Sequence, residues 1–167
     1  MLQDAGSLLK TSQQDLPRKI SSLLEKSRSL EKALEIEQSR QTAATADQLA
    51  SQAEVVGGIS LVVARLSLPS AEQLREAADR IRDRIGPGVV VLAAEIQGKA
   101  VLVAMAAPQA VKRGIHAGSL IRETAKITGG SGGGRPDMAQ AGGAEPDRIP
   151  EALLAARDLI VRKLQGE

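Results

Sequence analysis

The feature that most constrains the fold of this chain is the absence of aromatic residues: its 167 residues include no Phe, Tyr or Trp. Aromatic side chains bury the largest apolar area per residue, so the core must be assembled from Leu, Ile, Val, Ala and Met. The apolar content of 43% is nevertheless ordinary for a globular protein. We therefore expect one compact domain with a small, tightly packed aliphatic core, together with an appendage.

The chain also has no Cys and a single His, His116. This excludes disulfides and thiolate catalysis, and it removes the usual zinc ligands. No nucleophile or carboxylate lies close enough to His116 in sequence to suggest a triad. We therefore expect no catalytic residue, no metal site and no cofactor in this chain. No apolar run is long enough to span a bilayer and no signal peptide is visible, which favours a cytoplasmic protein without membrane contact.

Residues 1–56 have the composition of helices, with no Gly after Gly6. We expect a short helix over about 2–12 and a long helix over about 17–53, with Asp15 before its first turn. The long helix would be roughly 55 Å in length, and its apolar stripe needs a partner helix. Either a second copy of the chain, as a coiled-coil dimer, or an antiparallel helical hairpin within one chain would supply it. The stripe consists of Ile20, Leu23, Leu24, Leu30 and Leu34.

Gly57 and Gly58 break the helical pattern and mark the start of a second domain, residues 57–167. Apolar and β-branched runs predict strands over 59–66, 89–96 and 100–105. The last two runs are almost wholly apolar, so both faces of these strands should be buried. Helices are expected over 70–85, where Ser70 and Gln73 suggest a capping box, over 107–128 with a break at Gly114, and from 149 onward. The predicted fold is α/β (α+β): a helical arm or hairpin followed by helices packed on a sheet of three or more strands.

The segment 129–143 is unusually rich in Gly, with five Gly in its first six positions. We interpret it as a Gly-rich loop whose N–H groups could form an anion-binding concavity beside Arg135. A plain flexible linker is the alternative, whereas a P-loop is excluded because no Gly-Lys-Ser/Thr follows. Residues 97–135 carry six Lys or Arg against one Glu. A basic surface of this kind favours nucleic acid, although an ordinary solvated face would look similar.

The run from Gly133 to Gly143, Gly-Gly-Arg-Pro-Asp-Met-Ala-Gln-Ala-Gly-Gly, resembles the signature of the C-terminal domain of alanyl-tRNA synthetases, a member of the DHH-associated family. Leu8 to Thr11 and Asp15 to Pro17 resemble the start of that domain's helical arm, so the resemblance covers essentially the whole chain. Related phosphoesterases carry a Gly-Gly-His loop and an acidic metal-binding domain. This chain lacks both, which disfavours a phosphoesterase fragment.

The resemblance implies a non-catalytic module of an alanine–tRNA ligase that grips the elbow of tRNA-Ala. It would let the aminoacylation and editing modules upstream share one tRNA, and it would form a homodimer. ATP and zinc belong to those upstream modules. The alternative is a mainly structural dimerisation domain whose tRNA binding is weak or lost. Without aromatic rings for base stacking, binding should use shape and phosphates and should depend strongly on salt. The candidate tRNA contacts are Lys99, Lys112, Arg113, His116, Lys126, Gly130, Gly132, Gly133, Gly134 and Arg135.

Overall fold

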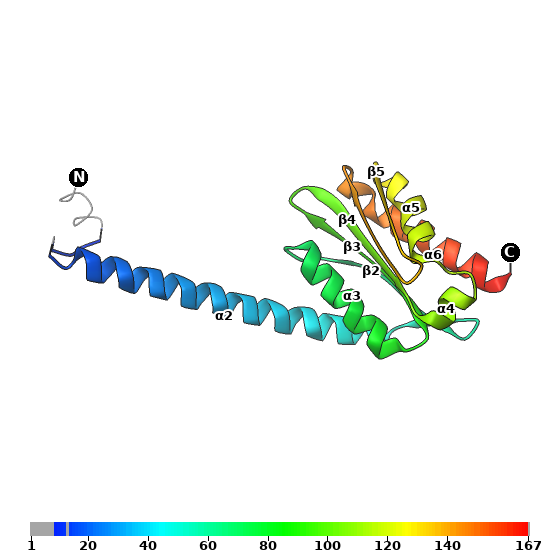
Figure 1. Cartoon of the computed structure of the whole chain (residues 1–167), viewed down its shortest axis with the longest axis horizontal. Helices are drawn as coiled ribbons and strands as arrows, with labels where there is room; N and C mark the ends of the chain where they lie inside the picture. Colours follow the sequence, from blue (N-terminus) through cyan, green and yellow to red (C-terminus); the bar gives the residue numbers. More distant parts are fainter. Residues whose placement is uncertain (1–8, 13, 167) are drawn as a thin grey trace. The chain divides into compact units, whose positions relative to one another are not determined.

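The computed structural model describes residues 9–12 and 14–166. The chain separates into two compact units, residues 1–41 and 42–167. The larger unit contains a six-stranded sheet with helices packed against it (Figure 1). This is the mixed α/β architecture that the sequence predicts. Among the described residues, no helix is both long enough and apolar enough to cross a membrane.

The first unit is dominated by helix α2 (Leu16–Ser51), which confirms the predicted long helix to within two residues at each end. Its start follows Asp15, whose carbonyl oxygen accepts a hydrogen bond from the Lys19 amide at 2.9 Å. The short helix predicted over 2–12 lies mostly outside the described residues, and residues 9–12 form turn and bend structure. The predicted apolar stripe is exposed: the side chains of Ile20, Leu23, Leu24, Leu30 and Leu34 have between 42% and 63% of their surface accessible.

The sheet of the second unit has the strand order β1-β2-β3-β4-β6-β5. Strands β2 and β3 are parallel, and every other neighbouring pair is antiparallel. The three predicted strands are confirmed as β2, β3 and β4, whereas the short strand β1 was not predicted. The strands are β1 (Glu54–Val56), β2 (Ile59–Leu66), β3 (Gly88–Ile96), β4 (Lys99–Ala106), β5 (Gly130–Gly134) and β6 (Met138–Gly143).

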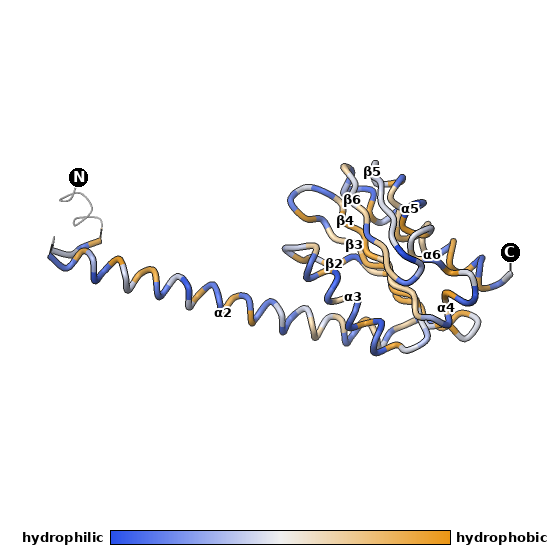
Figure 2. The backbone as a smooth tube through the Cα atoms, viewed as in Figure 1, coloured by the Kyte–Doolittle hydropathy of each residue, from blue (hydrophilic) through white to orange (hydrophobic). Residues whose placement is uncertain are grey.

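Helices cover both faces of this sheet. On one face, α3 and the last turns of α2 pack against the apolar side chains of β2, β3 and β4. On the other face, α5 and α6 pack against the same central strands. Strands β3 and β4 are therefore buried on both sides, as their continuous apolar sequence predicts (Figure 2). The helices of this unit are α3 (Ala71–Ile85), α4 (Pro108–Lys112), α5 (Ala117–Ile127) and α6 (Ile149–Gln165), with a short 3-10 helix, Pro146–Arg148, before α6.

Local signals fix several helix ends. The Ser70 hydroxyl accepts a hydrogen bond from the Gln73 amide at 3.2 Å, so Ser70 caps α3 as predicted. The reciprocal half of the capping box is not formed, because the Gln73 side-chain oxygen is buried without a hydrogen-bond partner. The expected break at Gly114 is also present, since Gly114 has a φ of 85° between α4 and α5.

An ion pair within the second unit ties the end of α2 to α3. Asp47 accepts hydrogen bonds from Arg80 at 3.0 and 3.1 Å and lies 3.0 Å from the Arg84 guanidinium. The hydrogen bonds from Arg80 hold the pKa of Asp47 below its usual value. Next to this pair, Ala46 is completely buried. The last turns of the helix are thus part of the globular core.

The Gly-rich segment corrects one expectation: it is a β-hairpin, not a loop. Residues 130–134 form β5 and residues 138–143 form β6, paired in antiparallel register. Glycine has little intrinsic preference for strands, so the sequence of β5 gives no strand signal. The hairpin forms because β6 pairs with β4 from Ala100 to Met105 and in turn supplies an edge for β5.

Candidate nucleic-acid interface

The hairpin β5–β6 forms one edge of the sheet. Its turn is closed by a 2.9 Å hydrogen bond from the Arg135 amide to the Met138 carbonyl. In an antiparallel ladder the backbone groups of successive residues point alternately toward and away from the partner strand. Counting from the closing pair, Gly130, Gly132 and Gly134 direct their N–H and C=O groups toward the outer edge of β5. The edge is therefore lined with backbone polar groups and carries only one side chain longer than hydrogen, Ser131.

Helix α5 packs closely against this strand. A methyl group at Gly118, in its first turn, would lie 2.6 Å from the Gly134 carbonyl oxygen. The amides of Ala117 and Gly118 donate to the carbonyls of Pro136 at 2.9 Å and Arg135 at 3.2 Å. These hydrogen bonds satisfy amides that a helix N-terminus otherwise offers to an anion. The start of α5 therefore holds the hairpin turn in place.

The glycines of the hairpin fall into two groups. A methyl group at Gly130, Gly132 or Gly134 would lie less than 3 Å from the backbone of β6, so packing within the chain explains these three. At Gly133 and Gly142 the nearest other atoms would be 3.9 Å away. Their positions in the register place these two residues on the same face of the hairpin as Gln140. Glycine weakens a strand and often marks a close approach by another molecule, so this second group is available for an external contact.

Two exposed cations flank the glycine strand. The Arg122 guanidinium lies 3.9 Å from the position that a Gly133 methyl group would occupy. Lys126 lies one helical turn further along α5, about 6 Å away along the helix axis, and its carbonyl accepts the Gly129 amide at 3.2 Å. Arg135 is at the opposite end of the strand, in the hairpin turn. We call Arg122, Lys126, Arg135 and the glycines of β5 the glycine edge.

The other predicted contacts do not all lie on the glycine edge. Arg113 donates to the carbonyls of Gly57 and Leu164, at the β1–β2 turn and the end of α6. That turn and the hairpin turn are separated by about four strand spacings, roughly 19 Å at ~4.8 Å each. Lys112 precedes Arg113 at the end of α4. The sequence-based interpretation of residues 97–135 as one basic surface is therefore wrong, because the topology sends Arg113 to the other edge of the sheet.

Two more of the predicted contacts, Lys99 and His116, lie at the start of β4 and just before α5. Lys99 is exposed at the start of β4, and its neighbour Ala100 shares a register row with Gly143 and Gly130. It therefore lies near the Lys126 end of the glycine edge. His116 precedes α5 and lines a cavity of about 20 Å³, together with Glu123 and residues of α6. Its side chain is thus on the α6 side of α5.

Arg122 was not among the predicted contacts. Its signal in the sequence was the i,i+4 spacing with Lys126, which places both cations on one side of a helix. No local pattern indicates that this side of the helix lies beside the glycines. Among the described residues, no cluster of three or more His, Asp or Glu side chains could hold a metal ion.

Comparison with known proteins defines the class. The DHHA1 domain matches residues 58–162, so the chain belongs to the DHHA1 domain family. Within that family it matches the C-terminal domain of alanyl-tRNA synthetase. The crystal structure of the C-Ala domain from Aquifex aeolicus alanyl-tRNA synthetase superimposes with a TM-score of 0.59 at 33% identity, covering 65% of this chain and 97% of that one.

Curated relatives extend the match to nearly the whole chain. Alanine–tRNA ligase of Alkaliphilus metalliredigens is 40% identical over 166 residues. Alanine–tRNA ligase of Acetivibrio thermocellus is 42% identical over 166 residues. Each alignment covers 99% of this chain and 19% of the relative. The chain therefore spans about a fifth of the length of these enzymes.

Proposed function

We propose that this chain is a tRNA-binding and oligomerisation module of an alanine–tRNA ligase, with no catalytic centre or cofactor of its own. It grips the elbow of tRNA-Ala, so that the aminoacylation and editing modules of the full-length cytoplasmic enzyme can share one tRNA. The observation that carries this proposal is the glycine edge, where Arg122 and Lys126 stand beside a strand almost free of side chains. Such a surface lets an RNA backbone come close to both charges.

The chemistry of the glycine edge favours recognition by backbone and shape. Arg122 and Lys126 can each neutralise a phosphate, and the glycine strand offers no bulky group that would hold the RNA away. Base stacking on aromatic rings is impossible in a chain without them. Binding should then release counterions, weaken steeply with salt and show little dependence on base sequence.

The test is a fluorescence titration of the chain with tRNA-Ala at several salt concentrations. We expect the double variant Arg122→Gln, Lys126→Gln to bind at least tenfold more weakly at low salt. The slope of log affinity against log salt should fall by nearly two, because two phosphate contacts are lost. The control variant Arg75→Gln, Arg162→Gln removes the same charge from exposed positions on α3 and near the end of α6, away from the glycine edge, and should have a much smaller effect. Equal losses in both variants, or no binding by the unmodified chain, would contradict the proposal.

A second observation favours oligomerisation through α2. In heptad positions, Ile20 and Leu34 occupy a, while Leu23 and Leu30 occupy d, and these apolar side chains are exposed. Lys26 at g would face Glu31 at e of a parallel, in-register copy, which is an attractive pairing. We therefore propose a parallel homodimer in which this stripe meets its counterpart in a second chain.

Sedimentation equilibrium tests the dimer. Leu30→Glu places a charge in the centre of the seam and should convert the dimer to a monomer at micromolar concentration, since burying an unpaired carboxylate is strongly unfavourable. Ser29→Glu adds the same charge at an outward position and should leave the dimer intact. A monomeric unmodified chain, or a Leu30→Glu variant that remains dimeric, would contradict the proposal. A dimer without affinity for tRNA would instead select a purely structural role.

A further inference from the structure

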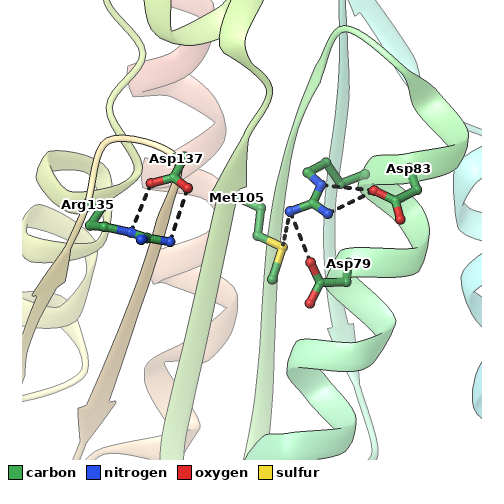
Figure 3. A network of polar contacts seen from close by, with 6 residues as sticks. Asp79, Asp83, Met105, Arg135 and Asp137 are labelled. Carbon is green, nitrogen blue, oxygen red and sulfur yellow. Dashed lines mark hydrogen bonds and ion pairs between the residues drawn. The ribbon is translucent and has the colours of Figure 1, made fainter.

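Two groups of charged side chains lie on either side of the strand that carries Met105, one in the turn of the β5–β6 hairpin and one on α3 (Figure 3). Arg135 forms two contacts with Asp137, from Nε to Oδ1 and from Nη2 to Oδ2, both at 3.3 Å. On α3, Arg82 lies 3.0 Å from Asp79 and 2.8 Å from Asp83. The charges of the turn therefore balance, while the neighbouring group on α3 has two carboxylates for one guanidinium. A guanidinium that is already paired is a poor site for a phosphate, although the Arg135 side chain is 75% exposed.

The structure assigns Arg135 a different role from Arg122 and Lys126: paired with Asp137, it recognises a neutral hydrogen-bond acceptor of the tRNA. Asp137 is then a positioning residue that fixes the Arg135 guanidinium and prevents it from acting as an indiscriminate phosphate site. This inference rests on the proposed tRNA-binding function and specifies how one part of the same surface works.

The geometry of the pair leaves the required donors free. A guanidinium has five N–H groups, and the contacts with Asp137 use one on Nε and one on Nη2. Both hydrogens of Nη1 and the second hydrogen of Nη2 remain. These form a fork suited to two adjacent acceptors, such as those on a guanine edge or a ribose. Because the charge of Arg135 is already balanced, contact with such a group displaces no counterion from the RNA.

The position of Asp137 is set by the fold. Its carbonyl accepts the Ala106 amide at the end of β4 at 2.9 Å, and the Arg135 amide closes the turn on Met138. Arg82 is anchored nearby through Asp79, Asp83 and a 3.7 Å contact from Nη1 to the Met105 sulfur. Its pKa is raised mainly by the hydrogen bond with Asp83, with a smaller contribution from the charge of Asp137. The Asp137 carboxylate therefore lies within the electrostatic reach of both guanidinium groups.

The test compares salt dependence among single variants titrated with tRNA-Ala. Arg122→Gln should lower the slope of log affinity against log salt by nearly one. Arg135→Gln should weaken binding by about tenfold, as expected for the loss of a bidentate contact, while leaving the slope unchanged. Asp137→Asn should release the Arg135 charge, raise the slope by nearly one, and tighten binding to poly(U) at low salt. Thermal melts of these exposed-site variants control for folding.

A DNA strand with the tRNA-Ala sequence distinguishes the two sources of the acceptor. If Arg135→Gln also weakens binding to this DNA, the acceptor is on a base; if the effect is confined to RNA, it is a 2′-hydroxyl. The inference is overturned if Arg135→Gln lowers the slope as Arg122→Gln does, or if Asp137→Asn leaves the slope unchanged. If the unmodified chain binds no tRNA, that result contradicts the proposed function, and with it the role assigned to Arg135.

Discussion

Replacing Gly132 by Ala should lower the free energy of unfolding by about 2–3 kcal/mol. The added methyl group would lie 2.3 Å from the Cβ and 2.6 Å from the Cα of Ala141, and 2.6 Å from the Gln140 carbonyl oxygen. Two of these are backbone atoms, so the contact can be relieved only by moving β5 away from β6. Movement of β5 would also disturb its packing against Gly118 of α5. Urea denaturation followed by circular dichroism measures the change.

Gly133→Ala is the matched control for this prediction. It makes the same chemical change one residue along the strand, where the nearest atom would be 3.9 Å from the new methyl group. Stability should be unchanged or increase by up to about 1 kcal/mol, because alanine restricts the unfolded chain. Binding of tRNA-Ala should nevertheless weaken if this face contacts RNA. Equal stability of the two variants would contradict close packing of β5 against β6.

Leu102→Ala should destabilise the second unit by about 2–5 kcal/mol. Leu102 is completely buried on β4, within the apolar cluster formed with α5 and α6. Its removal leaves a cavity lined by aliphatic side chains that are themselves held in place by both helices. The chain has no aromatic ring whose large surface could compensate for the lost contact. The expected signature is a lower urea midpoint with an unchanged m-value.

Leu154→Ala deletes the same atoms from α6 at a position that is 64% exposed. Its effect should stay within about 0.5 kcal/mol, because little apolar surface is returned to water. The comparison separates the effect of burial from the mere loss of a leucine side chain. A difference of less than about 1 kcal/mol between the two leucine variants would contradict the assignment of Leu102 to a close-packed core.

Most of the secondary structure could be predicted because its signals are local. The alternation of apolar runs with turn residues located β2, β3 and β4, and Ser70 marked the start of α3. The hairpin could not be predicted in this way. Glycine carries no periodic pattern, and β5 exists only because β6 pairs with β4. The partners of that ladder are distant in sequence, from 33 residues for Met105 and Met138 to 43 residues for Ala100 and Gly143.

The candidate site was predicted only in part, and for a related reason. The sequence identified the glycines, Arg135 and Lys126, because they lie close together in the chain. It also grouped Arg113 with them, although that side chain binds the Gly57 carbonyl at the other edge of the sheet. A sum of charges over a segment cannot tell in which direction each cation points after the chain has turned.

The sequence by itself determined that this protein has an aliphatic core, a long helix and no cysteine chemistry, since these properties depend on composition and local periodicity. It also carried the family resemblance, because the run from Gly133 to Gly143 is contiguous. Only the tertiary structure decided that the glycine segment is an edge strand, that Arg122 lies beside it, and that Asp137 balances the charge of Arg135. The first two features depend on strand order and helix packing, which bring together residues that are distant in sequence. The third depends on the geometry of the hairpin turn, which points two nearby side chains toward each other.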